Sequence, residues 1–326
     1  MDDAVDNRPT LAIPVFNRVG MIGECMRSAT DQSAVRVIVI DNQSDDGTWN
    51  RIEELRGDRI EALRNPANIG LFPNLNRCLT LATGPWVTIL CSDDRLPPGT
   101  AEAFSRGFDA APNAAVISGR GRFIDERGRL IGIFAQHLPA GEHPAGGDLI
   151  LAWLLESGGN PLNCPSGMAF RGAAVTKETS FTLDLPLTAD FEYALRLLRH
   201  GSLLVLDRPT TEMVRHPGQM SQRLIATWGV VFLRENLRIL RRHGPLSKAV
   251  RGRGSRAVIA TLAAFAAWLG MRALCRHGWR PCRGFLSVAL RAKAPLGLKA
   301  AAALRLVVTR LLPAWRMRNL AATVGR

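Results

Sequence analysis

The sequence predicts an α/β fold, in which a mostly parallel sheet lies between layers of helices and is followed by a basic, mostly helical C-terminal extension. Three observations support this class. Short apolar runs rich in β-branched residues alternate with helix-like stretches over the first 120 residues. Acidic side chains follow directly after two of these runs. The balance of charge changes abruptly near residue 241.

The first 120 residues are expected to form an alternating sandwich of strands and helices. A strand, a helix and a second strand within residues 10–40 are typical of a parallel pair buried on both faces. Breaks at Gly84-Pro85 and Pro97-Pro98-Gly99 separate later elements. The expected strands are 10–16, 35–40, 60–63, 86–91 and 114–118, and the expected helices are 19–31, 48–57, 72–83 and 98–111.

The middle of the chain has a different pattern. Residues 120–185 are rich in Gly and Pro, which predicts an irregular α+β half that closes over the first half, with one helix near 148–156. Apolar spacing and the breaker Gly201 then predict further elements. These are a helix at 190–200, a strand at 203–206 and a long helix at 224–243.

The net charge of +14 belongs to the C-terminal part of the chain. From Arg241 to Arg326 there are 18 Lys and Arg residues and no acidic residue, whereas the first 240 residues hold 24 basic and 28 acidic residues. The body is therefore slightly acidic, which argues against a nucleic-acid-binding protein that is basic throughout.

The basic tail mixes cationic and apolar residues, a pattern that suits an anionic membrane surface. Its longest uncharged run, 257–271, has 15 residues and is shorter than the ~20 needed to span a bilayer. Trp268, Trp279 and Trp315 are candidate interfacial anchors. The alternative is a soluble helical extension packed on the body, with its arginines facing water.

The cysteines and the N-terminus indicate a cytoplasmic protein. The six cysteines form no C-x-x-C pair, and several lie in apolar runs, which favours reduced, buried thiols. The N-terminal residues 1–10 are acidic and polar and lack the basic and apolar regions of a signal peptide.

Three acidic positions are candidates for chemistry. Asp41 ends a buried strand, at the edge where open α/β sheets bind ligands, and could accept hydrogen bonds from a nucleobase or ribose. Ser92-Asp93-Asp94 follows another buried strand, and a divalent cation that holds a diphosphate would offset the two adjacent carboxylates. Asp190 begins a helix, where a carboxylate serves either as a cap or as a general base.

Taken together, these motifs resemble the family 2 glycosyltransferases. The segments IPVFNR, IDNQSDDGTW, RNPANIG, LCSDDRLPPG and TADFEYALRLLRHG follow one another in the order and spacing of that family's nucleotide-diphospho-sugar (GT-A) domain. The resemblance implies a GT-A domain over 1–222, with a nucleotide half at about 8–120 and an acceptor half at about 121–222. Residues 223–326 would then form the helical, basic, membrane-associated C-terminal region.

The resemblance also implies the residues of the donor site. Opening-strand and loop residues would wall the nucleotide, and the acidic residue after the second strand would contact the base, which leaves the base and the sugar open. The residues implied for nucleotide-sugar binding are Pro14, Val15, Asn17, Asp41, Asn42, Arg64, Asn68, Gly70, Asn74, Asp93 and Arg171.

The chemistry implied by the resemblance is an inverting sugar transfer. Asp190 would be the catalytic base, and a divalent cation, Mg²⁺ or Mn²⁺, would be held by Asp94, Asp93 and His216. In this family the acceptor would be a growing glycan or a lipid-linked glycan of the cell envelope or an exported polysaccharide. The enzyme would work on the inner face of the plasma membrane.

Two other functions remain open from the residues. A nucleotidyltransferase also places paired carboxylates on an α/β sheet, but it would normally carry a Gly-rich loop after the first strand, where this chain has Val15-Phe16-Asn17-Arg18. The other alternative is a nucleotide-sugar-binding scaffold protein that has lost catalysis. No Walker-type nucleotide-binding loop occurs.

Overall fold

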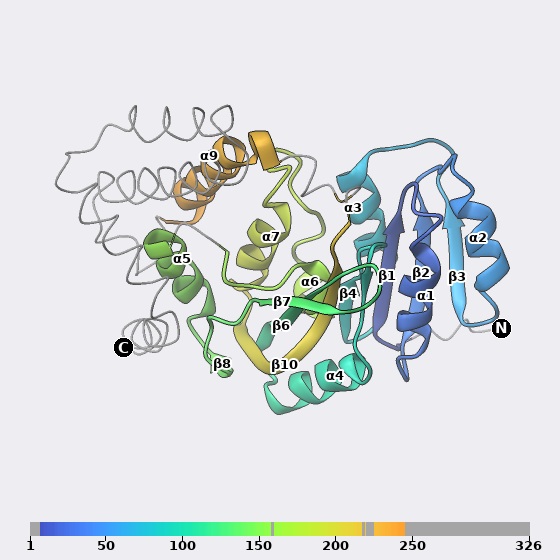
Figure 1. The fold of residues 1–326 in the computed structure, drawn as a ribbon. Helices are drawn as coiled ribbons and strands as arrows, with labels where there is room; N and C mark the ends of the chain where they lie inside the picture. The colour runs from blue at the N-terminus through green and yellow to red at the C-terminus, as the bar shows by residue number, and fades with distance from the viewer. Residues whose placement is uncertain (1–6, 158–159, 217–218, 220–224, 245–326) are drawn as a thin grey trace.

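The computed structural model describes residues 7–157, 160–216, 219 and 225–244, and it confirms the predicted α/β class (Figure 1). In this part of the chain a ten-stranded sheet has the order β3-β2-β1-β4-β9-β6-β10-β5, with β7 on β6 and β8 on β10. The strands are β1 (Thr10–Val15), β2 (Arg36–Asp41), β3 (Ile60–Arg64), β4 (Trp86–Ile89), β5 (Asp94–Arg95), β6 (Ala114–Ile124), β7 (Leu130–Phe134), β8 (Gly141–His143), β9 (Met168–Arg171) and β10 (Ser202–Val214).

Helices cover both faces of this sheet, because its inner strands bury side chains on both sides. Leu11, Ile13 and Val15 of β1 pack with one set of helices, and Ala12 packs with the other. The first set is α1 (Ile22–Thr30), α2 (Thr48–Leu55) and α4 (Thr100–Ala110). The second set is α3 (Leu71–Leu81), α5 (Gly146–Ser157), α6 (Gly172–Val175), α7 (Ala189–Leu197) and α9 (Ile225–His243).

The strand directions determine which loops meet. β1 to β4 run parallel to one another, and β6 is parallel to β10. β9 lies between β4 and β6 and is antiparallel to both, so β4, β6 and β10 share one direction. The loops that follow β1, β2, β3, β4, β6 and β10 therefore gather at one edge of the sheet, together with the segment that precedes β9.

The expectation that residues 120–185 close over the first half as an irregular layer is wrong. Strand 114–118 continues as β6 to Ile124, and strand 203–206 lengthens to the thirteen residues of β10. Together with β9, these strands extend the same sheet. β10 contains polar residues such as Asp207 and Glu212, which face solvent or ion-pair partners. Because these residues interrupt the apolar run, the sequence predicts only the short strand 203–206.

The core extends past residue 222. Ile239 and Leu240 of α9 are buried in the same cluster as Leu195 and Leu197 of α7. Figure 1 shows α9 beside α5 and α7. Residues 245–326, which include Trp268, Trp279, Trp315 and almost all of the basic tail, lie outside the described residues. In the described part of the chain, no helix is both long enough and apolar enough to cross a membrane.

Candidate active site

The candidate active site lies at the edge of the sheet where the carboxyl ends of the parallel strands meet, as expected for an open α/β sheet. Asp41 is the last residue of β2, and Asp93 and Asp94 follow β4. His216 follows β10, whose Met213 pairs with Asp94. The structure therefore brings the acidic motifs to one edge of the sheet.

Asp41 is completely buried and has internal partners. The Ser44 N–H and hydroxyl group donate to its carboxylate, and Arg64 Nε lies 3.0 Å from its Oδ2. Arg64 Nη2 also donates to Ser44 O at 2.7 Å, and its guanidinium group lies over the Trp49 ring, 5.5 Å from the centroid. Arg64 thus neutralises Asp41 and leaves a partly exposed guanidinium plane at the mouth of the site.

Asn42 and Asn74 are buried in an asparagine network instead of lining an open pocket. Asn42 Oδ1 accepts hydrogen bonds from Asn65 Nδ2 (2.8 Å) and from the Ile69 N–H (3.0 Å). Asn65 Nδ2 also donates to Asn74 Oδ1, and Asn74 Nδ2 donates to Ile40 O. Since these amide groups already have partners, Asn42 and Asn74 position the loop after β3, and their contact with a nucleotide-sugar stays a prediction.

Asn68 and Gly70 lie on the exposed rim of that loop. Asn42 Nδ2 donates to Asn68 Oδ1 (2.9 Å) and to Gly70 O (3.2 Å). Gly70 has φ +90°, a conformation that side-chain-bearing residues rarely adopt, and α3 begins directly after it. Asn68 and Gly70 therefore lie on the rim of the candidate site, and their contact with a nucleotide-sugar stays a prediction.

The loop after β1 forms the opposite wall. Pro14 and Val15 are buried in β1 and pair in register with Ile40 and Asp41. Asn17 is partly exposed with φ +53°; its N–H donates to Ser44 Oγ (2.9 Å), and its Nδ2 donates to Asp45 Oδ1 (2.8 Å). Pro14 and Val15 thus contribute backbone and shape, whereas Asn17 fastens the first loop to the second.

Asp94 is the most unusual carboxylate of the site. Ser166 Oγ donates to its Oδ2 at 2.6 Å, but its Oδ1 is buried and has no hydrogen-bond partner among the described residues. Burial, followed by the negative charge of Asp93, raises the pKa of Asp94 to about 8. A buried carboxylate with one unpaired oxygen is a ready ligand for a cation.

Asp93 is surrounded by cationic or titratable groups. His216 Nε2 lies 3.2 Å from Asp93 Oδ2, and Arg18 Nε lies 3.7 Å from the same oxygen. The His216 side chain is only 8 % exposed. These contacts join the loops after β1, β4 and β10. His216 thus contacts the neighbouring carboxylate through Nε2, and its role as a metal ligand stays a prediction.

The residues present fit a divalent cation that is shared with a diphosphate. Among the described residues, no cluster of three or more His, Cys, Asp or Glu side chains forms a complete protein cage. Mg²⁺ and Mn²⁺ prefer oxygen ligands, and Mg²⁺ is usually bound by one or two carboxylates plus substrate phosphates. Asp94, through its unpaired oxygen, and Asp93 beside it match that donor set.

Asp190 is the second residue of α7, and it lies near the same edge. Its Oδ1 accepts a hydrogen bond from the Phe191 N–H at 2.8 Å, and the residue as a whole is half-buried. Burial of the carboxyl group raises the pKa of Asp190 to about 6. Burial, Asp94 and Asp190 together raise the pKa of Cys164, so this thiol lies within the electrostatic reach of both carboxylates.

Arg171 does not join this site, which corrects the expectation that it binds the nucleotide-sugar. Since β9 is antiparallel, its last residue lies at the opposite edge, where Arg171 pairs with Trp86, the first residue of β4. Its guanidinium group donates to the carbonyls of Ala114, Phe108 and Ala111 and lies over the Phe108 ring. Arg171 therefore ties the end of α4 to the sheet.

Several site residues escape a reading of the sequence. Ser166 and Cys164, in the segment before β9, both contact Asp94. Ser166 lies 72 residues after Asp94 in the sequence, and Cys164 lies 70 residues after it. Arg18 reaches Asp93, and Asn65 joins Asn42 to Asn74. Arg18 and Asn65 lie in motifs that the sequence analysis quotes for the site, IPVFNR and RNPANIG. The others contact their partners through non-local folding.

Comparison with known proteins agrees with this arrangement. Residues 10–171 match the model of the family described as Glycosyl transferase family 2. The chain is 27 % identical over 226 residues to uncharacterized protein MT1568 of Mycobacterium tuberculosis (strain CDC 1551 / Oshkosh), and the match covers 67 % of this chain and 70 % of that protein.

Among solved structures, S. aureus TarS 1–349 in complex with UDP-GlcNAc superposes with a TM-score of 0.56 at 16 % identity, covering 86 % of this chain and 90 % of that one. A longer TarS structure gives a TM-score of 0.53, and the chain spans 54 % of its length. At this identity the likeness shows a shared GT-A fold. With the family match, it places the chain in glycosyl transferase family 2, as a glycosyltransferase with a GT-A fold.

Proposed function

We propose that the protein transfers a sugar from a nucleotide-diphospho-sugar to a hydroxyl group of a glycan or lipid-linked acceptor, with inversion at the anomeric carbon. The observation that carries this proposal is the buried Asp94 carboxylate, whose Oδ1 has no hydrogen-bond partner among the described residues, at the edge where the parallel strands end. Asp190, at the start of α7, supplies a second carboxylate, and its pKa of about 6 suits a base near neutral pH.

The nucleoside would bind between the loops after β1, β2 and β3. Asp41, Arg64 and Asn17 line these loops, with Asn68 and Gly70 on the rim. The partly exposed Arg64 guanidinium offers a flat cationic surface for the base or ribose. TarS, which shares this fold, has been solved with UDP and with UDP-GlcNAc.

The diphosphate would lie toward Asp93 and Asp94. A bound Mg²⁺ or Mn²⁺ would supply positive charge that offsets the charge growing on the leaving diphosphate. Arg18 and His216, which already face Asp93, would keep that carboxylate oriented.

Asp190 would act as the base. As the acceptor oxygen attacks the anomeric carbon, the bond from that carbon to the diphosphate breaks, and the hydroxyl proton passes to the Asp190 carboxylate. A single displacement of this kind inverts the anomeric configuration. Since burial raises the pKa of Asp190 to about 6, the carboxylate is largely ionised at neutral pH and still basic enough to accept a proton.

The cellular setting that we propose is the synthesis of a cell-envelope or exported polysaccharide at the inner face of the membrane. The support is the basic tail from Arg241 onward, with 18 Lys and Arg residues and no acidic residue, which suits anionic lipid headgroups.

The proposed base is tested by Asp190→Asn in the full-length protein. We expect transfer, assayed with a panel of nucleotide-sugars and Mn²⁺, to fall by roughly 10²–10⁴-fold, because the amide cannot take the proton. Donor binding, measured by calorimetry, should remain. In the wild type, kcat/KM should fall as pH drops below about 6, where Asp190 becomes protonated.

A stability measurement controls for misfolding. Because burial raises the pKa of Asp190, its ionisation destabilises the folded state as pH rises from about 4 to about 6. Asp190→Asn should therefore melt at the same or a higher temperature than the wild type at pH 7.5. The matched variant Asp58→Asn, at an exposed position, should keep full activity. Unchanged turnover of Asp190→Asn would refute the role of Asp190 as base.

A further inference from the structure

A second carboxylate, Glu235 of α9, lies against the start of the helix that carries Asp190. Its side chain is 2 % exposed. Glu235 Oε2 accepts hydrogen bonds from the Leu187 N–H (3.0 Å) and from Thr188 Oγ1 (2.8 Å). Thr188 is the residue that immediately precedes α7, and Asp190 follows two residues later. Glu235 therefore anchors the chain at the point where it enters the helix of the proposed base.

The other oxygen of Glu235 is free. Oε1 is buried and has no hydrogen-bond partner among the described residues. A buried polar atom without a partner costs free energy, so its presence calls for a reason beyond packing. Its negative charge acts on Asp190, where it adds to the effect of burial.

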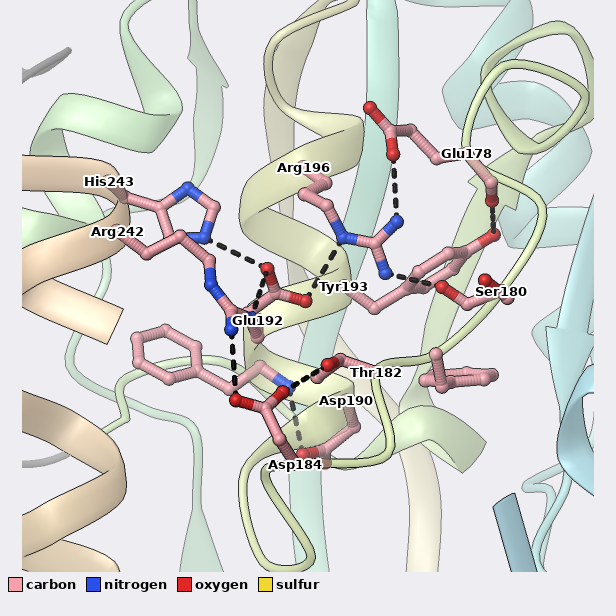
Figure 2. Close-up of polar contacts among 12 residues, drawn as sticks. Glu178, Ser180, Thr182, Asp184, Asp190, Glu192, Tyr193, Arg196, Arg242 and His243 are labelled. Atoms are coloured by element: carbon pink, nitrogen blue, oxygen red, sulfur yellow. Dashed lines mark hydrogen bonds and ion pairs between the residues drawn. The ribbon is translucent and has the colours of Figure 1, made fainter. Parts of the chain in front are cut away.

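Ion pairs at the end of α9 also join this helix to α7 and to the segment before it. Figure 2 shows His243 and Arg242, at the end of α9, meeting Glu192 and Asp184. His243 Nε2 lies 3.0 Å from Glu192 Oε1, and Arg242 Nη2 lies 2.9 Å from Asp184 Oδ2. Glu192 lies on α7, two residues after Asp190, so the two helices are joined on both sides of the base.

We infer that Glu235 is a positioning residue for Asp190: from α9 it fixes the first turn of α7 through Thr188 and Leu187 and presents a negative charge to the base. This inference rests on the proposed role of Asp190. It assigns to the segment after residue 222 a part in the chemistry as well as in the fold.

The groups that act on this pair come from several elements. Asp190 is affected by Glu235 from α9 and by the N–H groups of its own helix turn, and it in turn acts on Cys164 from the segment before β9. Burial raises the pKa of Glu235, while hydrogen bonds from Thr188 and Leu187 and the charge of Arg238 oppose that rise. Among these neighbours, only Glu235 combines a negative charge near Asp190 with hydrogen bonds to its helix turn.

The inference is tested with Glu235→Gln in the full-length chain. The glutamine carbonyl can still accept from Thr188 and Leu187, so the turn should stay in place while the charge is lost. The pKa of Asp190 is read directly by NMR of ¹³C-labelled aspartate carboxyl carbons, with the signal assigned by its loss in Asp190→Asn. We expect this pKa to shift downward in Glu235→Gln, and the acidic limb of kcat/KM to shift with it.

The matched control is Arg234→Gln, an exposed position on the same helix, which should leave the pKa of Asp190 unchanged. Glu235→Ala removes the hydrogen bonds as well, and we expect it to lower kcat with little change in the donor KM, while Glu235→Gln restores most of kcat. If Glu235→Ala does not fold, the comparison of Glu235→Gln with Arg234→Gln decides alone.

An unaltered Asp190 pKa in folded Glu235→Gln would overturn the inference. The NMR titration needs no turnover, so it gives its answer even if no donor is transferred. If the proposed function is wrong, the wild type will transfer no sugar, while the pKa of Asp190 will still differ between Glu235→Gln and the wild type.

Discussion

Asp94 and Arg171 show that charged side chains at strand ends can have different roles at the two edges of one sheet. Asp94 lies at the edge where parallel strands end, and it keeps an unpaired oxygen. Arg171 lies at the other edge, and its guanidinium group is used by three backbone carbonyls. Unused hydrogen-bonding capacity, rather than charge alone, separates a candidate ligand-binding residue from one that supports the fold.

Arg171→Ala should therefore destabilise the protein without weakening donor binding. The substitution leaves the carbonyls of Ala114, Phe108 and Ala111 without a charged donor and removes the stacking on Phe108. We expect the free energy of unfolding to fall by about 1–3 kcal/mol, measured by urea denaturation. A loss of nucleotide affinity in calorimetry at a temperature where the variant is folded would show that Arg171 acts on the donor after all.

At the scale of elements, the contact between α7 and α9 depends on a buried carboxylate. Glu192 is 0 % exposed and bonds Arg196 Nε (3.0 Å) and His243 Nε2 (3.0 Å). Burial alone would raise the pKa of Glu192, but the hydrogen bonds from His243 and Arg196 outweigh it and lower the pKa. The charged form is therefore the one that the folded state favours.

Glu192→Gln should loosen α9 from the body. The neutral amide weakens the contacts with Arg196 and His243, although Arg196 keeps its ion pair with Glu178 (2.7 Å), so we expect a cost of about 1–3 kcal/mol. We expect faster amide hydrogen exchange in α9, measured by mass spectrometry, while Glu53→Gln on the exposed face of α2 leaves exchange unchanged.

The pH dependence of this contact has a definite sign. Because the pKa of Glu192 is lowered, its contribution to stability is present above the pKa of an unfolded glutamate and is lost as pH falls through the lower folded value. The protection of the α9 amides, relative to their intrinsic exchange rate at each pH, should therefore fall only in acid. Equal exchange in Glu192→Gln and the wild type at neutral pH would contradict the proposed importance of this cluster.

The elements differ in how much the sequence reveals about them. The runs 35–40 and 86–91 are mostly apolar and are followed closely by acids, so both the strands and the positions of Asp41, Asp93 and Asp94 can be predicted. β9 has only four residues, and no local pattern states that it runs antiparallel between β4 and β6.

Contacts between distant residues are the part of the site that the sequence does not reveal. Glu235 meets Thr188 across 47 residues, and Ser166 meets Asp94 across 72. The spacing of apolar residues predicts α9 as a helix, but it does not say which polar residue of that helix faces the start of α7. Such contacts depend on how the chain packs in three dimensions, so they cannot be predicted from the residues around Asp190 alone.

At the scale of the whole molecule, the chain divides into a described, slightly acidic body and a basic tail. The acidic site residues lie in the body, while the excess of Lys and Arg begins at Arg241, in the last turn of α9. In the function that we propose, the body would bind a divalent cation and the tail would meet an anionic surface.

Deleting residues 245–326 tests the proposed membrane role of the tail. We expect the full-length protein to cosediment with vesicles that contain anionic phosphatidylglycerol and to lose this binding as salt rises, because each Lys or Arg contributes about 1 kcal/mol only near the charged surface. The shortened protein, which keeps α9, should stay in the supernatant. Equal partitioning of both proteins would refute the membrane role.

The single sheet has a consequence for how substrates enter and products leave. Backbone hydrogen bonds connect β4 to β9, β9 to β6 and β6 to β10. The part of the sheet that contains β1–β4 therefore cannot rotate away from the part that contains β6 and β10 without breaking the hydrogen bonds between two strands. Opening must then come from the loops that follow the strands. Turnover in this enzyme would be paced by loop motion rather than by rotation of one half against the other.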